Sequence, residues 1–126
     1  MRIEAPMGSF EGREGLGKAG ESLAERFLKR KGYEILKRNF KCRLGEIDLI
    51  AREGGEIVFV EVKSRIGTAF GFPEEQISRK KQRKLWCLSE FYLKRCPEDS
   101  SARIDVVSVL LDLVRKIDAQ ISLREY

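Results

Sequence analysis

The sequence predicts an α/β domain in which a central mixed β-sheet is flanked by two helices, in the order α-β-β-β-α-β-β. Two stretches, residues 20–31 and 74–95, carry apolar residues at helical spacing. Three others, residues 46–52, 56–64 and 102–111, are rich in Val, Ile, Leu and Phe, as strands are. A chain of 126 residues is long enough for one domain with one hydrophobic core.

Composition restricts the classes of function. Charged residues make up 36% of the chain and apolar residues 42%, a balance typical of a folded domain rather than a disordered one. The net charge of +5 favours an anionic partner. No apolar run approaches the about 18 residues that cross a membrane, and the N-terminal stretch lacks the apolar region of a secretory signal. We therefore predict a cytoplasmic protein with no membrane partner.

Histidine and cysteine counts exclude several kinds of active site. The chain has no histidine, which excludes Ser-His-Asp and Cys-His mechanisms and histidine-bearing metal sites. Cys42, Cys87 and Cys96 lack C-x-x-C spacing and indicate neither a disulfide framework nor a zinc site. Cys87 is expected to be a small buried side chain. Any hydrolysis must therefore use carboxylates, lysine and an oxygen-ligated metal.

The N-terminal part is predicted to contain an arm followed by a helix. Residues 1–16 are glycine-rich and aperiodic, and we expect a flexible arm before a single domain of residues 17–126. The helix at 20–31 ends at Gly32. Its apolar stripe is Leu23, Ala24, Phe27 and Leu28. Glu21 lies in the first turn of the expected helix, where the helix dipole by itself favours a carboxylate.

The next three strands include a predicted hairpin. Residues 33–38 are expected to form a strand, and residues 38–43 a basic connecting loop. The strands at 46–52 and 56–64 are joined by two glycines, Gly54-Gly55, which accept the positive φ angles of a tight hairpin turn. The hairpin is therefore expected to be antiparallel with a two-residue turn.

This turn predicts the register of the hairpin, in which paired positions sum to 109. Asp48 then lies opposite Glu61, and Glu46 lies opposite Lys63. Because side chains alternate with period two, all four are expected on one face. Directly opposite Cβ atoms lie about 4.5–5.5 Å apart, so the two central carboxylates should repel each other.

Three interpretations of this charged cluster are open. The charges can face water, Lys63 can neutralise the carboxylates in a structural ion cluster, or a divalent cation can bind between Asp48 and Glu61. One face of the hairpin is expected to be a buried stripe of Ile47, Leu49, Ala51, Val58, Val60 and Val62. The charged face also carries Ile50, Ile57 and Phe59. A sheet that is apolar on both faces should be covered on both sides, which places the cluster in a cleft at one end and favours the metal interpretation.

The second helix, expected at residues 74–95, follows a glycine- and aromatic-rich loop at 66–73. Its apolar face is expected to contain Ile77, Leu85, Leu88 and Tyr92, broadened by Trp86 and Phe91. A run of cations precedes Leu85; such a run is often a solvated face, but it is also suited to phosphate contacts that supply affinity without sequence readout. The expected nucleic-acid-binding residues are Arg65, Arg79, Lys80, Lys81 and Lys84. Lys81 is expected to point toward the sheet, and Gln76 lies at the same end as a neighbour of the site.

The C-terminal part is predicted to add two strands. Residues 102–111 are expected to form a buried strand, and residues 114–126 a last strand at the edge of the sheet. Asp105 is expected to pair with Arg103 rather than to join the site.

Several short motifs, in a fixed order, resemble a known family. Asp48, followed after a hairpin by Glu61-Val62-Lys63, resembles the signature of the PD-(D/E)XK nuclease superfamily. The surrounding motifs are more specific: GE at 20–21, GEID at 45–48, FVEVKSR at 59–65, FG at 70–71 and RIDVV at 103–107. Together they resemble the YraN-like family of small bacterial proteins, predicted endonucleases similar to archaeal Holliday junction resolvases. The resemblance extends from about residue 17 to the C-terminus.

The resemblance implies a restriction-endonuclease-like core and a metal-dependent DNA endonuclease, with branched, Holliday-junction-like DNA as a candidate substrate and a role in DNA repair or recombination. Asp48 and Glu61, with the carbonyl of Val62, would ligate Mg²⁺ or Mn²⁺, which prefer oxygen ligands. Lys63 would orient the attacking water or stabilise the charge of the transition state. Glu21 aligns with the helix glutamate near the resolvase metal site. Because resolvases act as dimers, a homodimer is also implied.

A different class of function is open at this point. The domain could bind nucleic acid or a protein partner without cutting, or could process RNA with the same site. A phosphate-binding groove gains nothing from two carboxylates, and this favours the enzyme.

Overall fold

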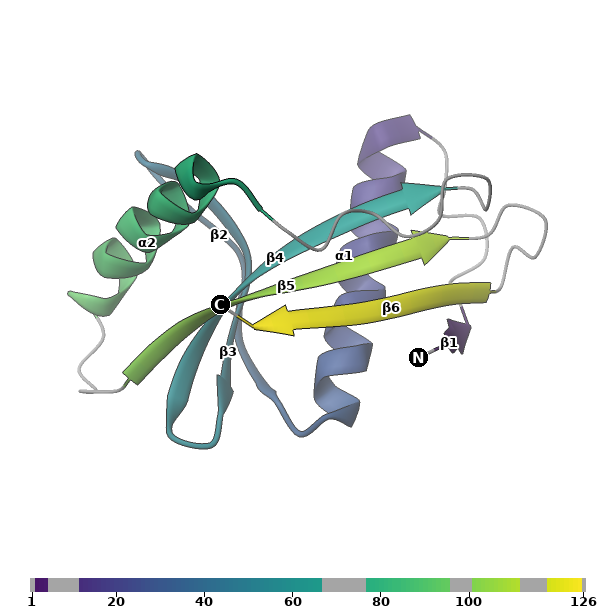
Figure 1. The fold of residues 1–126 in the computed structure, drawn as a ribbon, viewed down its shortest axis with the longest axis horizontal. Helices are drawn as coiled ribbons and strands as arrows, with labels where there is room; N and C mark the ends of the chain where they lie inside the picture. Colours follow the sequence, from purple (N-terminus) through teal and green to yellow (C-terminus); the bar gives the residue numbers. More distant parts are fainter. Residues whose placement is uncertain (1, 5–11, 67–76, 96–100, 112–117, 126) are drawn as a thin grey trace.

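A mixed β-sheet with one helix on each face makes up the fold (Figure 1). The structure is a computed structural model that describes residues 2–4, 12–66, 77–95, 101–111 and 118–125. The elements are β1 (Arg2–Glu4), α1 (Gly12–Arg30), β2 (Glu34–Cys42), β3 (Gly45–Glu53), β4 (Glu56–Ile66), α2 (Arg79–Leu93), β5 (Ser101–Leu111) and β6 (Asp118–Glu125). The predicted α/β class is confirmed. Neither described helix is long and apolar enough to span a membrane.

The six strands among the described residues are arranged in the order β1-β6-β5-β4-β3-β2. Only β4 and β5 are parallel, because α2 connects them across one face of the sheet; the other pairs are antiparallel. The last strand was expected at the edge, and this prediction was wrong. The three-residue strand β1 pairs with β6 and covers it, and so short a strand carries no periodic signal in the sequence.

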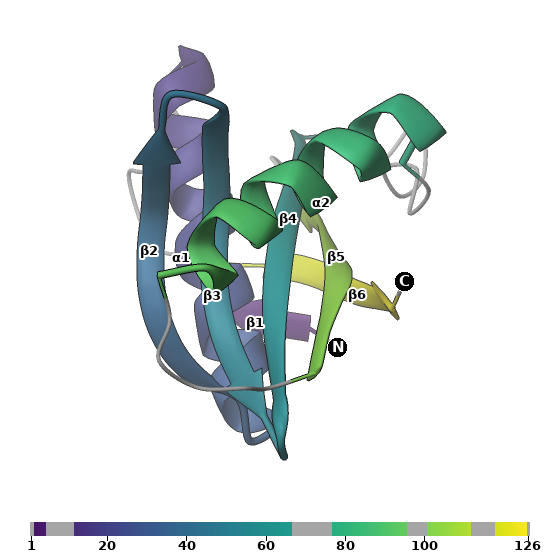
Figure 2. The same cartoon turned by 90° about the vertical axis from the view of Figure 1, so that its left-hand side faces the viewer.

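Each face of the sheet is buried against its own helix, as the apolar composition of both faces predicted. Figure 2 shows α1 and α2 on opposite sides of the strands. On the α1 side, the predicted helix stripe packs on β3, β4 and β5 through Leu49, Val58, Val60, Val107 and Val109. On the α2 side, Ile77, Leu85 and Leu88 pack on Ile50, Ile57, Phe59, Ile104 and Val106. Trp86 was expected to broaden this apolar face, but it is 36% exposed.

Helix α1 begins at Gly12 rather than at residue 20, so the predicted start was wrong. Its N-terminal half contains Gly12, Gly15, Gly17 and Gly20. Each glycine lowers the stability of a helix by roughly 1 kcal/mol relative to Ala, so helix propensity does not predict this part of α1. Leu16 packs against the α1-side core and Ala19 is buried, so tertiary burial outweighs that cost. Residues 2–4 and 12–16 of the expected arm therefore have regular structure.

Two other boundaries differ from prediction. The basic stretch 38–43 was expected to be a loop, but β2 continues to Cys42 and only Arg43 and Leu44 form the turn. Pairing with β3 and the packing of the Phe40 ring, 5.4 Å from Tyr92, hold this charged segment in the sheet. Helix α2 begins at Arg79, after the N-cap Ser78, whose hydroxyl accepts a hydrogen bond from the Lys81 N–H. Residues 74–76, where the helix was expected to start, lie outside the described residues.

The predicted hairpin register is confirmed for five pairs, from Glu53–Glu56 to Leu49–Val60. Gly54 has φ +57°, which favours glycine in the turn. The ladder ends at Leu49–Val60, however, so the expected pairs beyond it, Asp48–Glu61 and Glu46–Lys63, are not part of it. The two strands continue past this point without pairing to each other.

Side-chain alternation in β3 also changes at Asp48. Ile47 packs on the α2 side together with Ile50, whereas Leu49 packs on the α1 side. The expected stripe that joined Ile47 to Leu49 was therefore wrong. In the paired strand β2, Asn39 has φ +51° and lies at the level of Asp48. Such a left-handed residue inside a strand re-aims the side chains that follow it.

The opposite end of the hairpin carries a partly buried ion cluster centred on Arg103. Its guanidinium donates to Glu53 and Glu56, each at 2.9 Å, and to Asp105 at 3.0 Å. It also donates to the Tyr33 hydroxyl at 2.8 Å, which in turn donates to Asp105 at 2.9 Å. Asp105 is fully buried, so the expected pairing of Asp105 with Arg103 is confirmed. Arg103 thus bridges the two glutamates that face each other at the turn.

We expect Arg103→Ala to lower the free energy of unfolding by about 3–5 kcal/mol, because it leaves the buried Asp105 carboxylate without its cation. Urea denaturation monitored by circular dichroism measures the loss. Lys29→Ala, which removes the ion pair of Lys29 with Glu25 on the surface of α1, is the control and should cost about 0.5 kcal/mol or less. Equal losses in the two variants would show that the Arg103 cluster is not a structural support.

Candidate active site

The candidate site lies where β3 and β4 separate. Just beyond the last hairpin pair, the carboxylate of Asp48 accepts a hydrogen bond from the backbone N–H of Val62 at 2.7 Å. This bond occupies the place of a strand-to-strand contact and turns the Asp48 side chain into the gap. A cavity of about 260 Å³ opens there, lined by Leu16, Gly17, Glu21, Asp48, Glu61, Val62 and Ser64. The structure therefore brings Glu21, Asp48, Glu61 and Val62 together.

Glu21 reaches this cavity from α1, on the far side of the sheet from α2. It was expected in the first turn of its helix, where the dipole would account for a carboxylate. With α1 starting at Gly12, Glu21 lies more than two turns inside the helix. The dipole acts within the first turn, so it does not explain Glu21, whereas the cavity does.

The close approach of α1 to β4 depends on Gly20. A Cβ at Gly20 would lie 1.7 Å from the Oγ and 2.9 Å from the Cβ of Ser64. Rotating the Ser64 hydroxyl would remove the first clash but not the second. The absence of a side chain at Gly20 therefore sets the distance between α1 and β4, and with it the position of the neighbouring Glu21.

Burial and nearby lysines have opposite effects on the pKa of Glu61. Its Oε1 lies 3.7 Å from the Nζ of Lys81, which confirms that Lys81 points toward the sheet. Burial, followed by the charge of Asp48, raises the pKa of Glu61 to about 7, although Lys81 and Lys63 oppose the rise. The two lysines thus only partly compensate the carboxylate.

The other two carboxyl groups of the cavity are shifted in the same direction. Burial raises the pKa of Asp48, opposed by the Val62 N–H, and the charge of Glu46 adds to the rise. Burial also raises the pKa of Glu21, with contributions from the charges of Asp48 and Glu46. Carboxylates from α1, β3 and β4 therefore disfavour each other's ionisation, which is the pattern expected of a functional site.

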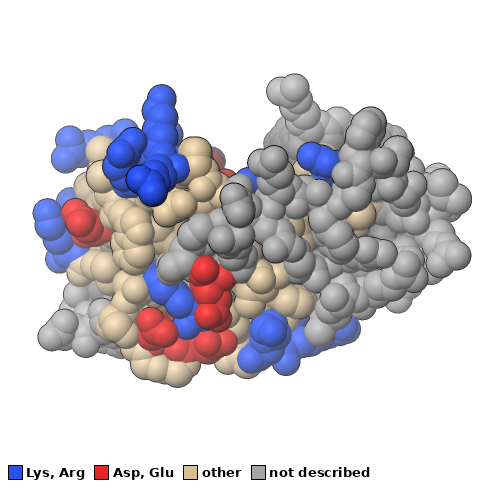
Figure 3. Space-filling view, in the orientation of Figure 1, with Lys and Arg blue, Asp and Glu red and all other residues tan. Residues whose placement is uncertain are grey.

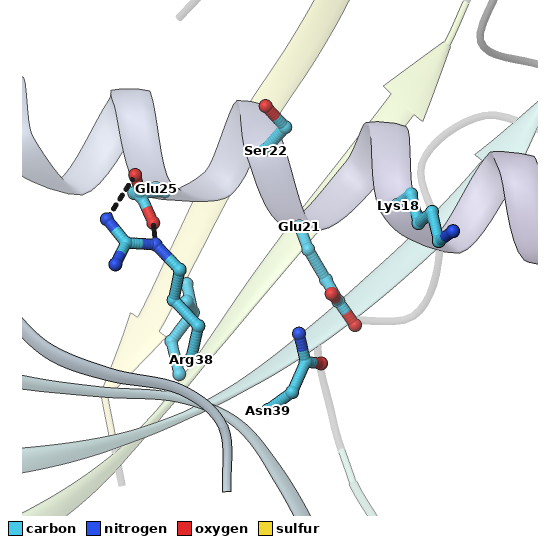
Figure 4. A pocket seen from close by; sticks show the side chains of 7 residues that line it. Lys18, Glu21, Ser22, Glu25, Arg38 and Asn39 are labelled. Atoms are coloured by element: carbon cyan, nitrogen blue, oxygen red, sulfur yellow. Dashed lines mark hydrogen bonds and ion pairs between the residues drawn. The ribbon is translucent and has the colours of Figure 1, made fainter.

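Sequence reasoning did not include Asn39 and Glu46 among the site residues. The Asn39 amide is assigned in the orientation that satisfies its hydrogen bonds. In this orientation its nitrogen donates to Glu21 Oε2 at 3.2 Å and to Glu46 Oε1 at 3.1 Å. Figure 4 shows Glu21 pointing from α1 toward Asn39 on β2. The only signal was an asparagine in a strand, a residue type that tolerates left-handed φ, and its partners could not be read from the sequence.

A second cavity, of about 210 Å³, lies beside the first and shares Glu21 with it (Figure 4). Its lining includes Lys18 and Ser22 as well as the ion pair in which Arg38 binds both carboxylate oxygens of Glu25. Glu25 is thus tied to β2. This bidentate pair fixes α1 against the strand that carries Asn39.

The oxygen donors of the cavity suit a hard divalent cation. Asp48 and Glu61 supply carboxylates, and the Val62 carbonyl is the third predicted ligand. In the part of the chain that the structure describes, no three carboxylates converge closely enough to enclose an ion by themselves. Mg²⁺ sites commonly use one or two carboxylates and complete the shell with water and substrate phosphate, so the residues present fit such an ion.

The predicted phosphate-binding cations lie around this site on α2 and β4. Arg79, Lys80 and Lys84 are exposed on α2, and Arg65 is partly exposed near the end of β4. Figure 3 shows lysines and arginines gathered over α2, whereas acidic side chains gather near the β3–β4 turn. Gln76, the predicted neighbour of the site, lies outside the described residues.

We expect Gly20→Ala to lower the free energy of unfolding by about 1–3 kcal/mol, because the new Cβ overlaps Ser64 and pushes α1 from β4. Gly17→Ala is the matched control on the same helix: nothing lies within 4 Å of its Cβ position. It should stabilise the protein by roughly 0.5–1 kcal/mol, since alanine favours the helix. Urea unfolding of both variants tests the pair. A neutral Gly20→Ala would mean that the helix does not depend on this close approach.

The raised pKa of Glu61 predicts a pH-dependent stability. A carboxyl group whose folded pKa is about 7, against an ordinary 4.5, stabilises the fold when protonated, and this contribution is lost as pH rises from 4.5 through 7. Glu61→Gln should therefore gain stability over the wild type across this interval, by at most about 3 kcal/mol. Urea unfolding in EDTA at several pH values measures the difference. A difference that stays constant with pH would contradict the shift.

Comparison with known proteins agrees with the motifs. A model of the "Uncharacterised protein family UPF0102" matches residues 20–109. A UPF0102 protein of Caldicellulosiruptor saccharolyticus is 48% identical over 103 residues, covering 81% of this chain and 87% of its own. Those of Lachnoclostridium phytofermentans and Persephonella marina are 49% and 47% identical, covering 82% and 75% of this chain and 88% and 82% of their own. The chain therefore belongs to the uncharacterised protein family UPF0102, the YraN family that its motifs resemble.

Proposed function

We propose that the protein is a metal-dependent endonuclease that hydrolyses phosphodiester bonds in DNA, with Mg²⁺ or Mn²⁺ as its cofactor. The observation that carries the proposal is that Glu21, Asp48 and Glu61, from three different elements, line one open cavity. Opening the sheet at this point forgoes strand pairing and places like charges together. A fold gains nothing from this arrangement unless something binds there.

A purely structural ion cluster is the alternative explanation of the cavity, and the Arg103 cluster shows how such a cluster is built in this protein. At Arg103 the carboxylates of Glu53, Glu56 and Asp105 lie 2.9–3.0 Å from the guanidinium that binds all three. In the cavity the Lys81–Glu61 contact is 3.7 Å, and the pKa of Glu61 stays raised. The contact of Lys81 with Glu61 is thus longer than the contacts within the Arg103 cluster, which supports a site for a cation and substrate.

The donor set suggests how a bound ion would be held. The carboxylates of Asp48 and Glu61 and the Val62 carbonyl would be its protein ligands, with Glu21 as a further ligand or a hydrogen-bonding partner of bound water. When bound, such an ion polarises a phosphoryl oxygen and lowers the pKa of a coordinated water. The Val62 N–H holds Asp48 in place at 2.7 Å, and the Asn39 amide holds Glu21.

The lysines have the complementary role toward the phosphate. Lys63 lies on β4 two residues after Glu61, so both side chains lie on the same face of the strand. From there its ammonium would orient the attacking water or stabilise negative charge that develops on the phosphoryl oxygens. Attack by water on phosphorus breaks one P–O bond and leaves a phosphate monoester and a free hydroxyl.

Cations outside the cavity would hold the DNA backbone. The proposed contacts are Arg65 on β4 and Arg79, Lys80, Lys81 and Lys84 on α2. Their contacts with phosphates would provide affinity that falls with salt and carries no base specificity. Branched, Holliday-junction-like DNA is the substrate that we propose, and a homodimer would match its two symmetric cleavage positions.

The test incubates the protein with a four-way junction, a flap, a duplex and single-stranded DNA in Mg²⁺ or Mn²⁺. We expect cleavage of at least one substrate, and a loss of roughly 100-fold or more in Glu61→Ala and Lys63→Ala, because each removes an interaction with the reacting phosphate. Gel electrophoresis measures cleavage, and fluorescence anisotropy in EDTA measures binding, which should persist in both variants.

Glu34→Ala is the control, since Glu34 is an exposed carboxylate at the other end of β2; it should cleave as the wild type does. A contaminating nuclease would be unaffected by the site variants. Binding without cleavage at any metal concentration would refute the nuclease and leave a nucleic-acid-binding module.

A further inference from the structure

A groove lies between α2 and the β2–β3 turn, apart from the carboxylate cavity. Its volume is about 370 Å³, and its lining includes Arg43 and Leu44 from the turn, Cys87 and Phe91 from α2, and Lys94 and Arg95 directly after the helix. We call it the α2 groove. None of these residues lines the carboxylate cavity, so the proposed nuclease activity leaves the groove without a role.

The α2 groove is continuous with the cations next to the carboxylate cavity. Lys80, Lys84, Cys87, Phe91 and Lys94 follow one another at intervals of four and three residues, so they form one stripe along α2. The Lys84 side chain passes 3.3 Å from where a side chain on Gly45 would begin, which shows that this stripe faces the β2–β3 turn. A strand leaving the carboxylate cavity along this side of α2 would enter the groove.

The charge of the groove suits a polyanion. Arg43, Lys94 and Arg95 contribute three cations, whereas Glu90 contributes one carboxylate. Arg95 and Lys94 are exposed. Cations that follow one side of a helix in this way can track the phosphates of a nucleic-acid backbone.

The groove also offers surfaces for bases. The Arg95 guanidinium lies 3.6 Å from the centroid of the Phe91 ring, so the two groups are stacked. An arginine fixed in this way presents a planar face on which a base can stack. Leu44, on the opposite wall, is 39% exposed, which is unusual for a large apolar side chain of this protein. In a duplex the bases are already stacked on each other, so these surfaces favour unpaired nucleotides.

We propose that the α2 groove binds a single-stranded segment of nucleic acid next to the carboxylate cavity. The substrate of the proposed nuclease would then carry unpaired nucleotides beside the bond that is cut, as flaps and open branch points do. The statement about the substrate rests on the proposed function, but binding of a single strand in the groove does not.

Cys87 provides a direct test, because its free thiol is exposed and lines the groove. The prediction that it is buried was wrong. We expect a short oligothymidylate, in EDTA, to slow alkylation of Cys87 by iodoacetamide several-fold. A blunt duplex with the same number of phosphates should slow it much less. Mass spectrometry of the peptide containing Cys87 measures the rate, with Cys42, which does not line the groove, as an internal reference.

Charge reversal in the groove provides the second arm. Lys94→Glu/Arg95→Glu should abolish protection by the oligothymidylate. Arg30→Glu/Lys37→Glu makes the same change in net charge at exposed positions outside α2, and it should keep the protection. Equal protection by duplex and single strand, or equal loss in both double variants, would overturn the proposal. Neither arm involves metal or cleavage, so protection without nuclease activity would refute the nuclease alone.

Discussion

The hydrogen bond from the Val62 N–H to the Asp48 carboxylate is the interaction on which the rest of the site depends. A sheet covered by helices on both faces offers no solvated surface for carboxylates. At the site, Asp48 enters this layer where β3 and β4 stop pairing with each other. The β3–β4 ladder ends at Leu49–Val60, and the side chain of Asp48 satisfies a backbone donor that the lost pairing would have left open. The cavity, its carboxylates and the access of α1 to them follow from that opening.

The two ends of the hairpin treat buried charge in opposite ways. At the turn, Arg103 donates hydrogen bonds to Glu53, Glu56 and the Tyr33 hydroxyl, and this network makes that end rigid. At the open end, Glu61 keeps a pKa of about 7 in spite of two nearby lysines. The uncompensated charge is tolerated because apolar cores on both faces of the sheet supply the stability. The closely hydrogen-bonded cluster at Arg103 thus supports the fold, and the more loosely paired carboxylates at the open end form the site. A binding or catalytic role requires such a division.

Local patterns predicted a large part of this architecture. The glycine turn and the alternation beside it predicted the hairpin and its register as far as Leu49–Val60. The reason is that a two-residue turn is compatible with a single register. The apolar stripe of α1 from Leu23 to Leu28 was also confirmed, because helical periodicity predicts which side chains share a face. Where local signals were weak, prediction failed. Glycines concealed the first half of α1, cations concealed the end of β2, and β1 was too short to show a period.

The sequence by itself limited the chemistry: with no histidine and no C-x-x-C spacing, it pointed to carboxylates, lysines and hard cations. It also determined which carboxylates lie near each other along the hairpin. Only the tertiary structure decided that Glu21 from α1 joins them, that Asn39 and Glu46 support it, and that α2 and the β2–β3 turn enclose a separate groove. The physical reason is that spacing along a chain fixes distances within one strand pair or helix. Distances between elements are set by packing, here by the close contact that Gly20 allows between α1 and β4.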